Sequence, residues 1–258
     1  MTESAIAGLG TLLALMTAAW AASVARRDVS IVDICWSLTI LAAAGVYASG
    51  ADDLTLRRAV LLVAVGLWAI RLAGYLAWRG WGAAEDKRYR AMRDRRPRFR
   101  WTSLFVVFWL QAVLAWIVSL PLLAVMHVEE PGGPLLDALG ALLFLVGLGF
   151  ETVGDWQMAW FKSDPANRGR VCDRGLWRFT RHPNYFGEAV LWWGLWCLAG
   201  TAPDAHWTVV GPLLLTWLLL RVSGVRLLES DLLREKPAYR DYVARTSAFL
   251  PLPPRRDR

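Results

Sequence analysis

The sequence predicts an all-α integral membrane protein with about seven transmembrane helices. Apolar stretches recur along the whole chain, hydrophobic residues make up 56% of its 258 residues, and it contains 16 tryptophans. A helix needs about 20 apolar residues to cross a bilayer, and tryptophan is enriched where the membrane meets water. Since no stretch remains that could build a separate soluble core, we expect residues 1–258 to form a single membrane domain.

Seven apolar stretches are the expected spans. They cover residues 5–24, 31–49, 59–78, 104–126, 134–160, 185–200 and 206–224. The last two are short for a hydrocarbon core of about 30 Å, so we expect them to tilt or to line a pocket. The first span follows no basic segment, which argues against a cleaved signal peptide.

The basic residues predict the orientation of these spans. Nine Lys and Arg residues lie in 79–100, six in 162–181 and nine in the tail from Arg221, whereas the loops 127–133 and 201–206 contain none. Because basic loops tend to stay in the cytoplasm, we expect the N-terminus outside and the C-terminus inside.

Composition and motifs exclude several other classes of protein. A net charge of +7 would suggest nucleic-acid binding in a soluble protein. Here the charge lies in loops between spans, so we expect membrane lipids as partners and no nucleic acid. The three cysteines and three histidines show no metal-ligand spacing. A Rossmann nucleotide site is excluded because the sequence has neither a strand pattern nor a G-x-G-x-x-G turn.

The densest group of polar residues follows the fifth span. Four cations there could form a cradle for phosphate groups, namely Lys162, Arg168, Arg170 and Arg181. Pro183 suits the first turn of a helix, whose free N–H groups would attract an anion. Asn184 and Glu188 share a face of that helix and suit a ligand with amide or hydroxyl groups. His182 alone would be interpreted as a structural histidine, but its neighbours favour a role in binding.

Two carboxylates precede this group in the fifth span. Glu151 and Asp155 are four residues apart and therefore share a helix face, with Lys162 on about the same face. Ionisable groups inside a membrane are costly and usually mark function. An interfacial set of salt bridges is the alternative interpretation.

These residues carry a family resemblance. The segment 174–188, R-G-L-W-R-F-T-R-H-P-N-Y-F-G-E, resembles a signature shared by steroid 5α-reductases, sterol reductases and isoprenylcysteine carboxyl methyltransferases. The tail 229–251 resembles their C-terminal block. Nearly the whole chain is similar to the bacterial branch known as domain of unknown function 1295, in features that include S-I-V-D-I-C-W at 30–36, E-D-K-R-Y at 85–89 and S-G-V at 223–225.

The resemblance implies a seven-helix bundle of the bacterial inner membrane that takes up NADPH from the cytoplasmic side. Residues 1–127 would then supply mainly the substrate side and 134–258 mainly the cofactor side. Six residues match cofactor-binding positions of the family: Asp155, Lys162, Arg170, Asn184, Tyr185 and Glu188. Three further residues are close candidates for cofactor binding: Arg168, Arg181 and His182.

On the substrate side, the resemblance implies that Tyr75 and Asp33 are catalytic. The Gln-Glu pair of steroid 5α-reductases is missing around Asp33, which departs from the pattern for steroids. An interfacial tyrosine and a helix-capping aspartate are the alternative interpretations. For the loop 85–89, a functional role and a solvated charged face are equally good interpretations.

The sequence is compatible with three candidate functions. The first is an NADPH-dependent reductase of an activated C=C bond in a 3-oxo-Δ4 steroid or a similar enone lipid. The second is an S-adenosylmethionine-dependent methyltransferase of a lipid or isoprenoid, against which the cation cluster counts because adenosylmethionine carries no phosphate. The third is a non-enzymatic transporter or scaffold, which gives no reason for polar groups so costly in a membrane.

Overall fold

The computed structural model describes residues 1–127, 133–199, 203–222, 229, 232–234 and 236–255. Regular structure within these residues is helical, and the β-contact found among them is an isolated bridge between Thr180 and Ser247. Six helical segments are long and apolar enough to cross a membrane: Thr2–Arg26, Ile31–Ser49, Leu56–Gly80, Phe99–Val118, Pro134–Ser163 and Asp204–Val222. The all-α fold class and the multi-pass character are therefore confirmed.

The remaining expected span, 185–200, corresponds to helix α9 (Pro183–Ala199), which has 17 residues. At 1.5 Å per residue it is about 25 Å long, shorter than the hydrocarbon core. The number of crossings and the orientation of the chain stay predictions.

The chain divides into two compact units. Unit 1 comprises Met1–Glu130 and Asp204–Gly211, and unit 2 comprises Pro131–Pro203 and Pro212–Arg258. Each unit has its own set of packed helices and its own polar network. The expected single membrane domain, with a substrate half and a cofactor half, stays a prediction.

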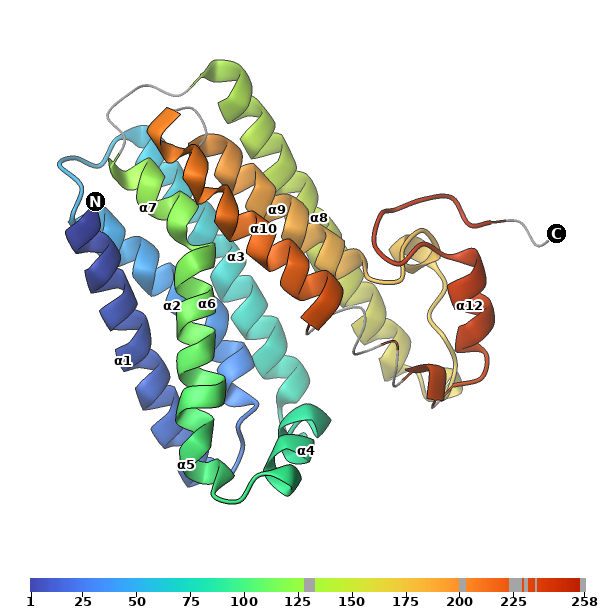
Figure 1. The fold of residues 1–258 in the computed structure, drawn as a ribbon. Helices are drawn as coiled ribbons and strands as arrows, with labels where there is room; N and C mark the ends of the chain where they lie inside the picture. Colours follow the sequence, from blue (N-terminus) through green and yellow to red (C-terminus); the bar gives the residue numbers. More distant parts are fainter. Residues whose placement is uncertain (128–132, 200–202, 223–228, 230–231, 235, 256–258) are drawn as a thin grey trace. The chain divides into compact units, whose positions relative to one another are not determined.

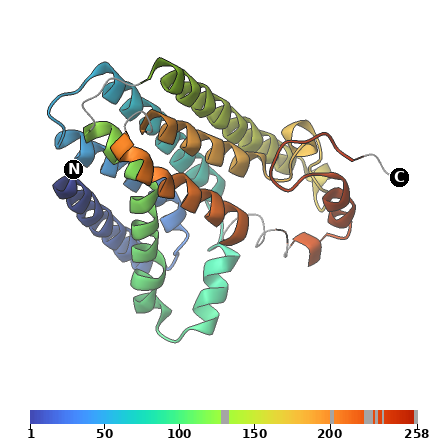
Figure 2. The same ribbon diagram turned by 45° about the horizontal axis from the view of Figure 1, so that its top comes forward.

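Unit 1 is built around three neighbouring helices. Its helical segments before the 128–132 gap are α1 (Thr2–Arg26), α2 (Ile31–Ser49), α3 (Leu56–Gly80), α4 (Lys87–Arg95), α5 (Phe99–Ser103), the π-helical η1 (Leu104–Trp109), α6 (Leu110–Val118) and α7 (Leu120–His127). Helix α2 packs against α1 and α3, and the α5–η1–α6 segment packs along α1 (Figure 1). Fully buried Tyr47, Trp68 and Phe108 fill the space between them. Helix α4 lies at the end of this bundle where α5 begins (Figure 2).

The expected span 104–126 is wrong at both ends. The helix already begins at Phe99, and it is interrupted at Ser119 before α7 begins. Pro121 has no N–H to donate to the preceding turn, which breaks the helical ladder at this point. The Ser119 hydroxyl is hydrogen-bonded to the Trp116 carbonyl at 2.8 Å and to the buried Tyr47 hydroxyl at 2.9 Å, so the break leaves this buried hydroxyl satisfied.

Unit 2 is built on the pair α8 and α9 (Figure 1). Its other described elements are the 3₁₀ turns η2 (Pro165–Asn167) and η3 (Gly175–Arg178), the π-helical η5 (Leu218–Val222) and α12 (Tyr239–Arg245). Helix α8 (Pro134–Ser163) is the longest, with 30 residues. The 3₁₀ turn η4 (Pro203–Val209) and α10 (Val210–Trp217) run across the boundary between the units.

Glycines at seven-residue spacing let α8 and α9 touch backbone to backbone. A Cβ atom on Gly147 would lie 2.5 Å from the Gly187 carbonyl oxygen, and one on Gly140 would lie 2.8 Å from the Gly194 carbonyl oxygen. Further along, a Cβ on Gly154 would lie 3.1 Å from the ring of Pro183. Small residues are the usual means of close helix approach in membranes. This packing fixes the residues at the start of α9 against the last turns of α8.

Candidate functional site

The end of the α8–α9 pair joins two of the predicted cofactor residues. Pro183 opens α9, so Asn184 is the second residue of that helix. Its side-chain amide donates a hydrogen bond of 3.2 Å from Nδ2 to Oδ1 of Asp155 on α8. Asp155 is only 4% exposed, and a buried carboxylate needs such partners to offset its desolvation. The pair therefore holds an amide and a carboxylate together where the two helices meet.

Glu151 lies one turn before Asp155 on α8 and is buried as well. It belongs to the stretch that packs against Gly187, since a Cβ on Gly187 would lie 2.5 Å from the Glu151 backbone nitrogen. Both carboxylate-bearing residues thus belong to the part of α8 covered by α9. For Asp155 one partner is the Asn184 amide.

The predicted cations divide into an exposed group and a buried one. Lys162, in the last turn of α8, and Arg168 and Arg170, in the following loop, are exposed. Arg181 is 8% exposed and bound within the protein. Only the exposed three are therefore accessible to a phosphate group in this conformation.

The guanidinium of Arg181 has four described contacts inside unit 2. Nε donates to Oε1 of Glu229 at 2.7 Å, and Nη2 donates to Oε2 at 3.0 Å. Nη1 donates to the carbonyl oxygens of Val243, at 3.1 Å, and Thr246. Arg181 thereby ties the C-terminal segment to the residues that precede α9. The geometry favours a positioning role for this arginine.

His182 is part of the same network. It is 4% exposed, and its Nε2 lies 3.0 Å from Oε1 of Glu229. Because a carboxylate only accepts, Nε2 is the donor. Burial would raise the pKa of Glu229, but the hydrogen bonds from His182 and Arg181 outweigh it and hold the pKa below its ordinary value. The His182 ring also stacks on the Tyr185 ring, with centroids 5.3 Å apart and planes 2° apart.

The C-terminal segment adds further contacts to the loop before α9. The Tyr242 hydroxyl donates to the Trp177 carbonyl, and the Trp177 indole donates to the Gly154 carbonyl at 3.0 Å. The Thr180 hydroxyl donates to the Phe249 carbonyl at 2.8 Å. The structure thus brings Asp155, Asn184, His182 and Tyr185 to one end of the α8–α9 pair, with Glu188 half-buried one turn further along α9.

In unit 1, Asp33 is the centre of a second network. Its Oδ1 accepts from the Tyr89 hydroxyl at 2.7 Å, and its Oδ2 accepts from Nη2 of Arg88 at 2.8 Å. Arg88 also binds Asp86, whose backbone N–H donates to the Ser30 hydroxyl at 2.8 Å. Burial and the nearby Asp33 carboxylate raise the pKa of the Tyr89 hydroxyl. The network ties the loop before α4 to the first turn of α2.

Tyr75 lies at about the level of this network along the α2–α3 pair. The Ser37 hydroxyl donates to the Ala69 carbonyl at 3.0 Å, which sets the antiparallel register of the two helices. Asp33 lies one turn before Ser37 on α2, and Ala73 lies one turn after Ala69 on α3. Tyr75 is within roughly half a turn of Ala73. Tyr75 is half-buried, and the Arg79 guanidinium lies 5.5 Å from its ring centroid. The catalytic roles of Tyr75 and Asp33 stay predictions.

Three participants in these networks were not predicted as site residues. Glu229 joins Arg181 and His182, while Arg88 and Tyr89 bind both oxygens of Asp33. The signal for the last two is the motif E-D-K-R-Y, in which a cation and a phenol stand side by side. For Glu229 the sequence signal is weaker. It is an acidic residue in a basic tail, and nothing in the local sequence indicates that it binds Arg181, 48 residues away.

Most of the chain matches the model of one protein family. Residues 19–246 match the family model described as a protein of unknown function, DUF1295. The chain belongs to this family. The matched region includes the Asp33 network and the Arg181–Glu229 network. It ends at Thr246, whose carbonyl accepts a hydrogen bond from Arg181.

A relative of this DUF1295 chain occurs in a eukaryote. The uncharacterized protein C594.04c of Schizosaccharomyces pombe is 25% identical over 281 residues, which cover 97% of this chain and 80% of that protein. No solved structure matches the chain.

Proposed function

We propose that this chain is a membrane-embedded, NADPH-dependent reductase of an activated C=C bond in a lipophilic substrate. The observation that carries the proposal is the Asn184–Asp155 hydrogen bond where α8 meets α9. The exposed cations Lys162, Arg168 and Arg170 are contributed by the end of α8 and the loop between the two helices. One chain segment therefore supplies a polar pair whose carboxylate is buried and several exposed cations suited to phosphate. The resemblance of 174–188 to the reductase signature supports the same assignment.

The residues present suit a phosphorylated dinucleotide. A carboxylate and an amide held together can bind the carboxamide or the ribose hydroxyls, and arginines suit phosphate oxygens through paired hydrogen bonds. We assign Asp155 and Asn184 to the first task and the three exposed cations to the second. NADPH, when bound, supplies the hydride of the reduction. Arg181 and His182 would position the start of α9 through Glu229.

On the substrate side, we assign Tyr75 to the carbonyl of an enone. The reduction adds one hydride and one proton across the C=C bond, and negative charge builds on the carbonyl oxygen. A phenol that donates a hydrogen bond to this oxygen stabilises the charge as it develops. Asp33 would act as a positioning residue, because Tyr89 and Arg88 bind both of its oxygens. A 3-oxo-Δ4 steroid and other enone lipids are the substrate class.

The first test is identification of the nucleotide retained after purification in mild detergent, by mass spectrometry. We expect NADPH or NADP⁺. The second is NADPH oxidation that depends on an added enone lipid and falls at least roughly 100-fold in Tyr75→Phe, the usual cost of a lost oxyanion donor. Wild-type activity in this variant would remove Tyr75 from the mechanism, and retention of adenosylmethionine would overturn the reductase assignment.

One observation favours a second function, methyl transfer from S-adenosylmethionine to a lipid or isoprenoid. Arg181 is bound by Glu229, which removes one of the four cations that argued for a phosphorylated cofactor. Thermal-shift measurements with each cofactor separate the two functions. A ligand that binds only the folded protein raises its melting temperature, so stabilisation by adenosylmethionine but not by NADPH would favour the methyltransferase.

A further inference from the structure

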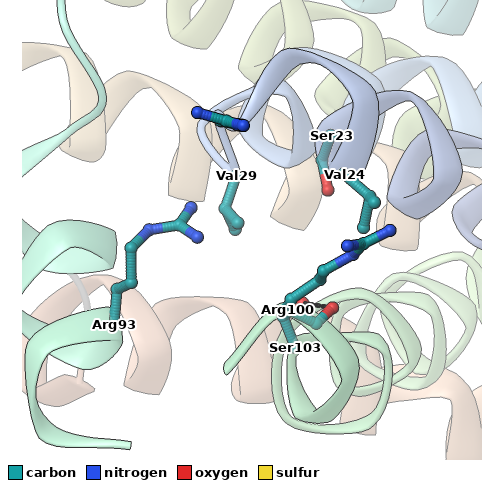
Figure 3. Close-up of a pocket in the computed structure, with 7 residues that line it drawn as sticks. Ser23, Val24, Val29, Arg93, Arg100 and Ser103 are labelled. Atoms are coloured by element: carbon teal, nitrogen blue, oxygen red, sulfur yellow. Dashed lines mark hydrogen bonds between the residues drawn. The ribbon is translucent and has the colours of Figure 1, made fainter. Parts of the chain in front are cut away.

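A basic cavity lies in unit 1, at the end of the bundle formed by α1, α4 and α5. It has a volume of about 170 Å³, and its lining residues are Ser23, Val24, Arg27, Val29, Arg93, Arg100 and Ser103. Figure 3 shows Arg93 reaching toward Val29 from one side, while Arg100 lies beneath Ser23 and Val24. Three guanidinium groups and two hydroxyl groups therefore surround one small space. None of these residues belongs to the predicted cofactor or substrate sites.

The positive charge of the arginines in this cavity is only partly balanced by carboxylates of the protein. Arg93 binds the Glu85 carboxylate through two hydrogen bonds, of 2.6 and 3.1 Å, and Asp28 lies next to Arg27 in the chain. Among the residues that the structure describes, no carboxylate forms an ion pair with Arg27 or with Arg100. Neither guanidinium therefore has a described carboxylate partner, and that of Arg100 lies 5.0 Å from the Trp101 ring centroid. Arginine favours phosphate because its planar N–H groups match the phosphate oxygens.

The surroundings place the cavity at a membrane surface. Two segments long and apolar enough to span a membrane end beside it: Arg26 is the last residue of the first, and Phe99 is the first residue of the other. The Trp20 and Trp101 rings lie 5.7 Å apart, the Trp20 indole donates to the Arg100 carbonyl at 3.0 Å, and Trp101 is 56% exposed. Paired indoles at the ends of apolar helices are typical of the headgroup level of a bilayer.

We propose that this cavity binds the phosphate of an anionic phospholipid headgroup. Arg27 and Arg100 bind the phosphate oxygens. The Ser23 and Ser103 hydroxyls line the cavity beside them, and each donates its own proton to a backbone carbonyl, that of Trp20 or of Arg100. The volume suits a single headgroup, because it is below the range of roughly 300–1,000 Å³ typical of sites for larger ligands. The exposed Trp101 and the half-buried Val24 line the path of the acyl chains along α1 and α5.

The test is native mass spectrometry of the full-length protein, taken from nanodiscs of phosphatidylcholine with phosphatidylglycerol into mild detergent. We expect wild type to retain one phosphatidylglycerol. The double substitution Arg27→Gln with Arg100→Gln should lower its retention roughly tenfold or more, as expected for lost charge-assisted hydrogen bonds. The matched control is Arg26→Gln with Arg96→Gln, which removes the same charge from exposed neighbours outside the cavity.

A second pair, Arg27→Lys with Arg100→Lys, keeps the charge and guards against a folding defect in the glutamine variant. We expect intermediate retention, because lysine lacks the paired geometry of arginine. Equal loss in the cavity and control variants would mean that only surface charge attracts the lipid, and would overturn the site. Inorganic phosphate at millimolar concentration serves as the second probe. If it alone stabilises wild type through these arginines, and phosphatidylglycerol is not retained, the cavity is a free-anion site and the lipid assignment fails.

Discussion

Arg181 and Glu229, 48 residues apart, form a two-point ion pair in which Nε and Nη2 of the arginine bind the two carboxylate oxygens. The side chains are only 8% and 14% exposed. A buried pair of this kind is costly to disrupt, because removal of one partner leaves the other charged and desolvated. The pair therefore fixes the C-terminal segment of unit 2 against the residues that open α9.

Substitution of Glu229 by alanine should destabilise the protein by about 3 kcal/mol, since Arg181 and His182 both lose their acceptor. The measurement is thermal unfolding in detergent. Asp173→Ala is the matched control, because Asp173 also binds an arginine, Arg245, but with both side chains about 40% exposed. Such an exposed pair contributes roughly 0–1 kcal/mol. Equal losses in both variants would show that the Arg181 network does not hold unit 2 together.

The same carboxylate should give the stability of the protein a distinct pH dependence. The pKa of Glu229 is lower in the folded protein than its ordinary value of 4.5. Its contribution is therefore complete above this value and is lost as the pH falls through the lower folded pKa. Melting temperatures of wild type and Glu229→Gln, measured between pH 7 and pH 3, should differ most near neutral pH and converge in acid. A constant difference across this range would contradict the assignment.

Gly187→Ala should separate α8 from α9. A Cβ here would lie 2.5 Å from two backbone atoms of α8, the Glu151 nitrogen and the Gly147 oxygen, which cannot move as a side chain can. We expect a loss of about 2 kcal/mol, in the range for overpacked sites, and weaker NADPH binding because the Asp155–Asn184 pair is pulled apart. Gly149→Ala on α8 is the control, since its Cβ would meet nothing within 4 Å.

Asp33→Ala should release the first turn of α4 from α2. Tyr89 and Arg88 would lose their shared acceptor, and we expect faster cleavage by trypsin at the basic residues of α4. Asp94→Ala, which changes an exposed carboxylate on the same helix, should leave the cleavage rate unchanged. If the two variants are cleaved alike, Asp33 does not hold the first turn of α4 against α2.

Much of the fold follows from sequence pattern alone. Six of the seven expected spans correspond closely to helical segments, because a run of apolar residues in a membrane has to satisfy its backbone groups within one helix. The remaining differences have local causes. Pro121 interrupts the expected span 104–126, and α9, with 17 residues, is shorter than the hydrocarbon core. The packing of α8 on α9 could also have been predicted, since its glycines recur every seven residues.

Apolar runs and motifs in the sequence are enough to predict the all-α membrane fold, the family and the identity of the polar residues that the bilayer makes costly. Which of those residues bind one another is visible only in the folded chain. Arg181 resembles Arg168 and Arg170 in the sequence, yet it is buried on Glu229 while they remain exposed. Asp33 likewise acquires its partners from helix α4, more than 50 residues away. Apolar runs are local and can be read along the chain, whereas hydrogen bonds between distant segments depend on which side chains the folded backbone brings within 3 Å, roughly the length of such a bond.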